Sequence, residues 1–243
     1  MTVLVTRPAE QGLALCSLLN DGGVSTLHHP LIRIVANPSV ETLLSQLRDS
    51  DIVIAVSQHA VQFAQQWLAK HQANWPQNTR YLAVGQKTAH YLSKVTGQDV
   101  NYPTVSDSEH LIQLPELNRI AGKRVLILRG NRGRELIRES LFSLGADVDY
   151  CETYQREFIP FDPLSCVASW QAQKVDTLIV TSSEQLEYLN RMMHSQAQQW
   201  LHQQHLLVPS ERIAAIAHSL GFARVTNVGS AANMELLAAL QPK

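Results

Sequence analysis

The sequence predicts an α/β protein of two similar domains, each built around a mostly parallel sheet. Three observations lead to this prediction: the length of the chain, an alternation of short apolar runs with longer amphipathic segments, and a repeat of that alternation. With 243 residues, 45% of them hydrophobic, the chain is about twice the size of a common domain and can bury two cores. The alternation is typical of β-α units that feed a parallel sheet.

Seven short runs rich in β-branched residues predict strands, and most are continuously apolar, as in a sheet covered on both faces. They cover residues 3–6, 52–57, 81–85, 125–129, 177–182, 213–216 and 224–228. Between them, apolar residues at helical spacing predict helices over 12–19, 60–68, 88–92, 134–144 and 184–192. Gly23 and Gly145 follow the first and fourth helix and suit C-caps.

An internal repeat is the most informative feature. VLVTR at 3–7 matches VLILR at 125–129, and the same offset of 122 residues carries Gly23 onto Gly145. DIVIAVSQHAVQF from Asp51 matches DTLIVTSSEQLEY from Asp176 at an offset of 125. YLAVG then parallels IAAIA, and SEHLIQL parallels NMELLAAL. Four matched segments in one order and at similar offsets predict two similar domains.

A more polar extended segment follows the first helix of each repeat. These segments cover residues 27–36 (LHHPLIRIVA) and 149–159 (DYCETYQREFI). Pro30 makes the first a poor central strand, because proline cannot donate to a ladder. Edge strands and crossovers between the domains are both open interpretations.

Charge and cysteine usage exclude several classes of protein. Lys and Arg total 20 against 21 Asp and Glu, so no basic excess is present to bind nucleic acid. Cys16, Cys151 and Cys166 are far apart and form no C-x-x-C pair, which argues against a disulfide framework or structural zinc. The opening apolar run reaches Arg7 too soon for a signal peptide or a membrane span. We expect a cytoplasmic protein with no nucleic-acid or membrane partner.

Common catalytic motifs are missing as well. The chain has no G-x-G-x-x-G, G-x-x-x-x-G-K-[ST], G-x-S-x-G or H-E-x-x-H, which disfavours nicotinamide enzymes, P-loop NTPases, α/β-hydrolases and zincins. His202 and His205 have no third ligand at a matching spacing, so no metal site is predicted. His28 and His29 are neighbours on a predicted strand, and we expect them to point to opposite faces as surface and packing residues.

The ends of five predicted strands carry small polar groups just before a helix. They are Thr6-Arg7-Pro8, Ser57-Gln58, Gly85-Gln86-Lys87-Thr88, Arg129-Gly130-Asn131 and Thr181-Ser182-Ser183. In an open parallel sheet such turns meet at the carboxyl edge, where helix N-termini can bind carboxylates or phosphates. Simple N-capping explains any one serine or threonine. Their occurrence in both repeats favours an anion-binding cleft.

Tyr154 in CETYQRE is a second candidate, because a phenol on a polar segment is poorly explained as a core residue. A functional role and a packing role with the hydroxyl in water are both open.

Over nearly its whole length, the sequence resembles the uroporphyrinogen-III synthase family. The similarity lies in the opening VLVTRPAEQGLALCSLLNDGGVSTLHHPLIRI, in VLILRGNRGRELIRESLFSLGADVDYCETYQR, and in the two strand-to-serine turns after Asp51 and Asp176. The resemblance implies two flavodoxin-like α/β domains joined by a two-stranded antiparallel linker, with the active site in the cleft between them. It implies a discontinuous first domain of residues 1–33 and 158–243, a second domain of 36–150, and linker strands near 31–36 and 151–158.

The activity implied by the resemblance is cyclisation of hydroxymethylbilane to uroporphyrinogen III, with loss of water and inversion of ring D, in haem and porphyrin biosynthesis. No cofactor is expected. Carried over by position, Tyr154 would assist departure of the hydroxyl group. The residues implied to hold substrate carboxylates are Arg7, Ser57, Gln58, Gly85, Thr88, Arg129, Gly130, Thr181, Ser182 and Ser183.

The sequence departs from the family pattern at Ala217-His218-Ser219-Leu220, where a Gly-x-x-Thr turn is frequent, so no contact is assigned there. We expect a monomer, and a transient contact with the upstream deaminase is left open. The alternative function is a non-catalytic, two-domain α/β binding protein that closes on a small polyanion.

Overall fold

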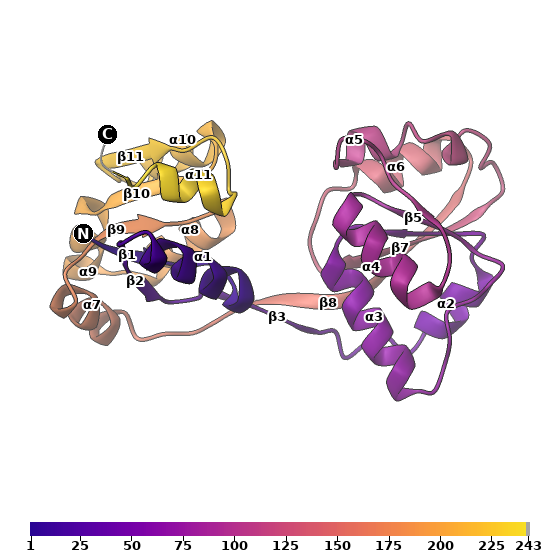
Figure 1. Ribbon diagram of the computed structural model, residues 1–243, viewed down its shortest axis with the longest axis horizontal. Coiled ribbons are helices and arrows are strands. Elements are labelled where there is room, and N and C mark those ends of the chain that lie inside the picture. The colour runs from indigo at the N-terminus through magenta and orange to yellow at the C-terminus, as the bar shows by residue number, and fades with distance from the viewer. Residues whose placement is uncertain (242–243) are drawn as a thin grey trace. The chain divides into compact units, whose positions relative to one another are not determined.

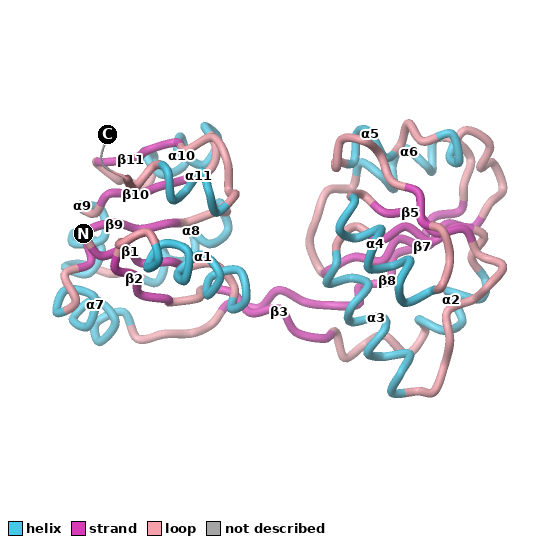
Figure 2. The backbone as a smooth tube through the Cα atoms, viewed as in Figure 1, coloured by secondary structure: helices cyan, strands magenta, loops and turns pink. Residues whose placement is uncertain are grey.

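The computed structural model describes residues 1–241, and the chain forms two compact units (Figure 1). Unit 1 consists of Met1–Arg33 and the chain from Glu157 onward, and unit 2 consists of Ile34–Arg156. Each unit contains one sheet flanked by helices (Figure 2). The predicted fold class, two α/β domains with mainly parallel sheets, is confirmed.

Unit 1 has a five-stranded parallel sheet in the order β11-β10-β9-β1-β2. Its elements are β1 (Thr2–Val5), α1 (Ala9–Asp21), β2 (Ser25–His28), α7 (Pro163–Ala172), β9 (Val175–Ile179), α8 (Ser183–Met192), α9 (Ser195–Gln203), β10 (His205–Val208), α10 (Glu211–Ser219), β11 (Arg224–Asn227) and α11 (Asn233–Ala238). Counted along the chain, this is the 2-1-3-4-5 strand order of flavodoxin-like folds.

Alternate residues of β1 pack on opposite helical layers, which explains its continuously apolar sequence. Leu4 joins the core under α7, α8, α9 and α10, whereas Val3 and Val5 join the core under α1 and α11. Gly23 and Gly145 lie just past α1 and α6 (Leu136–Ser143) with φ of 80° and 82°, a conformation that favours glycine.

Unit 2 has a six-stranded sheet in the order β3-β8-β7-β4-β5-β6, and the five strands from β8 to β6 pair in parallel. Its other elements are β3 (Ile32–Ala36), α2 (Leu43–Asp49), β4 (Ile52–Ala55), α3 (Gln58–Lys70), β5 (Arg80–Ala83), α4 (Gln86–Thr96), β6 (Val100–Asn101), α5 (Ser108–Leu111), the 3-10 helix η1 (Pro115–Leu117), β7 (Arg124–Gly130) and β8 (Asp147–Phe158). Helices α2, α3 and α4 cover one face, and α5, η1 and α6 cover the other.

The first polar segment contains the end of β2 and the whole of β3, and the second lies almost wholly in β8. Strand β3 is at the edge of its sheet, as Pro30 suggests. The backbone N–H of Asn37 donates to the carbonyl of Thr153 at 3.1 Å, and the N–H of Ile159 donates to the carbonyl of Leu31 at 2.9 Å. The residue numbers of the first segment fall from 37 to 31 while those of the second rise from 153 to 159. The two segments therefore run antiparallel to each other.

The sequence repeat corresponds to two sheets with the same strand arrangement, in which the chain begins at different strands. Read from β8, unit 2 has the order β8-β7-β4-β5-β6, which matches β2-β1-β9-β10-β11 in unit 1. The matched segments VLVTR and VLILR lie on β1 and β7, and the segments after Asp51 and Asp176 lie on β4 and β9. The two units are therefore circular permutants of one β-α arrangement.

The prediction of a strand at 213–216 was wrong, because this segment lies in α10. The side chain of Ser210 accepts a hydrogen bond from the N–H of Ile213 and caps the helix. Ile213, Ala214 and Ala217 form its buried face, at a spacing that suits a helix. The strand that corresponds to RYLA of β5 is HLLV of β10, at His205–Val208.

Among residues 1–241, no helix is long and apolar enough to cross a membrane. All three cysteines are free.

Replacing Leu4 by alanine should lower the free energy of unfolding by about 2 to 5 kcal/mol, because the side chain is fully buried in the core of unit 1. Leu13, which is 58% exposed on α1, is the matched control, and its replacement by alanine should change stability by no more than about 0.5 kcal/mol. Urea unfolding followed by circular dichroism measures both, and equal effects would contradict this account of the core.

Candidate functional site

The predicted site residues lie in two groups, one at the carboxyl edge of each sheet. In unit 1 they follow β1 and β9. In unit 2 most of them follow β4 and β5 or, for Arg129 and Gly130, form the end of β7. In each sheet, two neighbouring strands are followed by helices that pack on opposite faces. These strands are β1 and β9 in unit 1, and β7 and β4 in unit 2. Such topological switch points are the usual ligand crevices of open α/β sheets.

Tyr154 on β8 is a buried residue of unit 2 with a polar contact at its hydroxyl. Only 2% of its surface is exposed, and its ring packs among core residues on the α3 side of the sheet. The ring centroids of Phe63 and His59 lie 6.1 and 5.8 Å away. The hydroxyl of Ser57 donates a hydrogen bond to the Tyr154 hydroxyl oxygen over 3.3 Å.

A register shift between β7 and β8 determines the face on which Tyr154 lies. Arg129 pairs with Glu152, but the next residue, Gly130, pairs with Tyr154. Without this bulge, strict alternation would place Tyr154 on the same face as Tyr150. Instead Tyr154 joins the core that contains Cys151, whereas Tyr150 packs on the opposite face. Bulges next to functional sites commonly re-aim a side chain in this way.

Gly130 leaves the space that the ring of Tyr154 occupies. A Cβ atom at this position would lie 2.5 Å from Cε2 and 2.6 Å from Cζ of Tyr154, closer than real Cβ contacts. The backbone N–H of Asn131 also donates to the carbonyl oxygen of Tyr154 at 3.2 Å. The end of β7 and the ring of Tyr154 therefore form one packed unit.

The serines after β4 and β9 are equivalent N-caps in the two repeats. Ser57 accepts a hydrogen bond from the N–H of Ala60, and Ser182 accepts one from the N–H of Gln185, both at 3.2 Å. Nearby, the hydroxyl of Ser183 accepts a hydrogen bond from Arg212 at 3.3 Å. Thr181 is half-buried in the turn before Ser182.

The N-terminus of α4 differs, because Gly85 offers no side chain to cap it. The exposed Gln58 donates from its side-chain amide to the carbonyl of Lys87 at 3.4 Å and so links the first turns of α3 and α4. Thr88 is buried in the first turn. Lys87 lies in the polar turn that the sequence singled out, but no substrate contact was assigned to it.

Gln58, Lys87 and His90 line a cavity of about 610 Å³ beside α4. The full lining is Gln58, Gln86, Lys87, Ala89, His90, Ser93, Asp99, Val100, Asn101 and Tyr102. Of the predicted site residues, Gln58 lines this cavity, and Lys87 comes from the polar turn at 85–88 that the sequence singled out. Asp99, which precedes β6, was not predicted.

Arg7 just after β1 and Arg129 near the end of β7 occupy equivalent places in the two repeats but have different partners. The Nη1 atom of Arg7 donates to Asn233 Oδ1 at 2.8 Å and to the carbonyl of Ala231 at 3.1 Å, both neutral acceptors. Burial lowers the pKa of Arg7. The Nη1 atom of Arg129 instead donates to Glu135 Oε1 at 2.9 Å.

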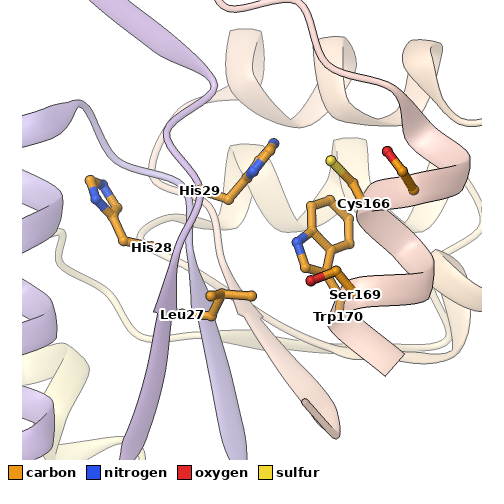
Figure 3. Close-up of a pocket in the computed structure, with 7 residues that line it drawn as sticks. Leu27, His28, His29, Cys166, Ser169 and Trp170 are labelled. Carbon is orange, nitrogen blue, oxygen red and sulfur yellow. The ribbon is translucent and has the colours of Figure 1, made fainter. Parts of the chain in front are cut away.

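A second cavity, of about 300 Å³, lies in unit 1 and has none of the predicted site residues in its lining (Figure 3). His28 and His29 extend to opposite sides of the strand end there, as expected (Figure 3). His29 packs edge-on against Phe161 and Trp170, with centroids 5.0 Å away in each case, and burial lowers its pKa. Among the described residues, no group of three His, Cys, Asp or Glu side chains could hold a metal ion.

The strand orders and the polar sheet edges define a protein of two flavodoxin-like α/β units whose helix N-termini suit an anionic ligand. The family model described as uroporphyrinogen-III synthase HemD matches residues 14–237. The chain belongs to this family, which confirms the resemblance seen in the sequence. It therefore has uroporphyrinogen-III synthase activity, a cyclising hydro-lyase reaction of tetrapyrrole biosynthesis, and the non-catalytic alternative is set aside.

Relatives and solved structures agree with this assignment. The uroporphyrinogen-III synthases of Salmonella typhimurium and Escherichia coli are each 44% identical over 246 residues, which cover 99% of this chain and 100% of the relative. A mutant synthase from Thermus thermophilus has a TM-score of 0.64 at 17% identity, covering 98% of this chain and 97% of that chain. The synthetase from Helicobacter pylori has a TM-score of 0.60 at 17% identity, covering 99% of both chains. At this identity the structures support the fold.

Replacing Gly130 by alanine should destabilise unit 2 by about 1 to 3 kcal/mol, because the added methyl group overlaps the ring of Tyr154. In a Tyr154→Leu background the same change should have a smaller effect, since the ring is gone. Urea unfolding of the four proteins gives the coupling between the two positions. Additive effects would show that the two residues do not pack against each other.

Proposed function

We propose that the chain converts hydroxymethylbilane, a linear tetrapyrrole with eight carboxylates, to uroporphyrinogen III with loss of water and inversion of ring D. The observation that carries this proposal is the phenol of Tyr154, held by Ser57 at the switch point of unit 2 in a member of this family. The reaction requires protonation of the leaving hydroxyl group, stabilisation of a cationic azafulvene, and control of the conformation in which ring D attacks.

Tyr154 is the proposed general acid. The N–H of Ala60 donates to Ser57 Oγ, and the Ser57 hydroxyl in turn donates to the oxygen of Tyr154. Because the Tyr154 oxygen accepts the hydrogen bond from Ser57, the phenol proton remains free for another acceptor. We propose that this acceptor is the departing hydroxyl oxygen of the substrate. Successive hydrogen bonds polarise one another, so the backbone of α3 would strengthen the phenol as a donor. Water would leave ring A with that proton.

The substrate carboxylates are proposed to bind to backbone N–H groups and small polar side chains rather than to a basic patch. The net charge of −1 leaves no general excess of positive charge, so binding must be local. In unit 2 the uncapped first turn of α4 at Gly85 and Thr88, together with Gln58 and Gly130, offers such groups. Lys87 adds a cation beside them.

In unit 1, Thr181, Ser182 and Ser183 at the start of α8 are proposed to bind further carboxylates. Arg7 supports them, because its hydrogen-bond partners are neutral and leave its charge uncompensated. Arg129 is different, since Glu135 already compensates its charge. The substrate contact expected of Arg129 from the sequence is therefore not part of this proposal.

We also propose that the protein acts in the cytoplasm. Cys16, Cys151 and Cys166 are all free thiols, which fits a reducing compartment.

The purified protein incubated with hydroxymethylbilane should yield type III product in excess over the type I isomer that forms without enzyme. Isomer analysis of the oxidised porphyrins measures the ratio. A ratio equal to that of the spontaneous reaction would contradict the proposed function.

Replacing Tyr154 by phenylalanine should lower the initial rate by about 10²- to 10⁴-fold, the usual contribution of a positioned general acid. The residual enzymatic product should still be type III, because the carboxylate contacts remain. The matched control is Tyr81→Phe, since Tyr81 is also buried in unit 2 and its hydroxyl donates to the carbonyl of Pro76 at 2.8 Å. This variant should keep the rate.

Initial rate and isomer ratio, corrected for spontaneous closure, separate the possible roles of Tyr154. A full rate in the Phe variant would leave Tyr154 with a packing role alone. A shift of the enzymatic product to type I would mean that the hydroxyl positions ring D instead.

A further inference from the structure

We propose that Arg129, Glu135 and Tyr150 form a brace that positions the phenol of Tyr154 and does not itself contact substrate. This inference rests on the proposed role of Tyr154 as general acid.

One carboxylate closes the brace. Glu135 Oε1 accepts from Arg129 Nη1 at 2.9 Å, and Glu135 Oε2 accepts from the hydroxyl of Tyr150 at 2.6 Å. The Cζ atom of Arg129 lies 4.3 Å from the centroid of the Tyr150 ring. The three side chains come from β7, from the start of α6 and from β8, so they tie the turn between β7 and α6 to the neighbouring strand.

The brace continues into the backbone beside Tyr154. Arg129 Nε donates to the carbonyl of Gly130 at 3.2 Å, and Gly130 is the residue against which the Tyr154 ring packs. The next residue, Asn131, donates from its N–H to the carbonyl of Tyr154, and its side-chain oxygen accepts the N–H of Arg156 at 3.0 Å. Movement of this turn would therefore move the bulge that aims Tyr154.

Gly133 adds a steric contact from the turn to the guanidinium. Its φ is 157°, and a Cβ atom there would lie 3.0 Å from Arg129 Nη2. The backbone of the turn thus passes close over the buried arginine.

The charges of the brace are compensated within unit 2. Hydrogen bonds from Tyr150 and Arg129 hold the pKa of Glu135 below its usual value, so Glu135 is anionic at neutral pH. Burial and the hydrogen bond to Glu135 raise the pKa of Tyr150 to about 12, so its hydroxyl stays protonated. The guanidinium of Arg129 is paired with Glu135, so its charge is compensated inside the brace and not held free for a substrate carboxylate.

Replacing Glu135 by glutamine removes the charge and keeps the shape of the side chain. We expect kcat to fall about 10- to 100-fold, because a small misplacement of a catalytic group has effects of that size. KM should change little, since no substrate contact is lost. Tyr150→Phe, which removes only a hydroxyl, should act in the same direction and more weakly.

Glu109→Gln is the matched control, because Glu109 on α5 contacts a residue of the same turn. Glu109 forms an ion pair with Arg134, which follows Gly133, and both side chains are exposed. Exposed pairs of this kind contribute little, and kcat and KM should stay at the wild-type values.

The decisive readout is the dependence of the Glu135 effect on Tyr154. In a Tyr154→Phe background, Glu135→Gln should cause no further loss of kcat, because the group that the brace positions is already gone. A multiplicative loss in the double variant would overturn the proposal. A normal kcat in Glu135→Gln, or a change confined to KM, would also overturn it and would favour Arg129 as a direct ligand.

Two measurements keep these outcomes interpretable. Near-UV circular dichroism and urea unfolding establish that each variant is folded, and if Glu135→Gln does not fold, Tyr150→Phe takes its place in the same double-variant comparison. A full rate in Tyr154→Phe would defeat the proposed role of Tyr154. A slow Tyr154→Phe beside a fast Glu135→Gln would defeat only the brace.

Discussion

The register shift between β7 and β8 determines the chemistry available at the edge of unit 2. It turns Tyr154 away from the face of Tyr150 and into the core beneath α3, where its hydroxyl meets Ser57. The absence of a side chain at Gly130 makes room for the ring. One skipped pairing and one glycine thus place a phenol at the switch point of the sheet, next to the serine that caps α3.

The hydrogen-bond partners of two arginines at equivalent strand ends explain why their charges are not equally available. Arg7 bonds to the neutral Asn233 side chain and a carbonyl, so its charge remains available to an anion. Arg129 is neutralised by Glu135 and lies on the face opposite to Tyr154. In a chain with a net charge of −1, this difference matters, because each uncompensated cation is a large share of the attraction for a substrate with many carboxylates.

Sequence reasoning found what depends on local pattern. The apolar runs of β1, β4, β7 and β9 are buried on both faces. Their repetition in the sequence predicted two sheets of similar arrangement. The discontinuous first domain was implied by the family resemblance and not by periodicity, and the circular permutation is seen only in the strand orders of the two sheets. IAAIA was misassigned, because its apolar residues fit a short strand as well as a helix face and the cap at Ser210 was overlooked. The bulge before Tyr154 and the partner of Arg129 depend on contacts between β7, β8 and α6, which a period-two pattern does not encode.

The central claim is that the phenol of Tyr154 donates a proton to the leaving group. Site-specific replacement of Tyr154 by a series of fluorinated tyrosines changes the acidity of the phenol with little change in ring size. The measurement is kcat for type III formation across this series, at a pH where each phenol remains protonated. Proton donation predicts that kcat follows the acidity of the phenol along a Brønsted line. A kcat that is independent of phenol acidity would contradict the claim.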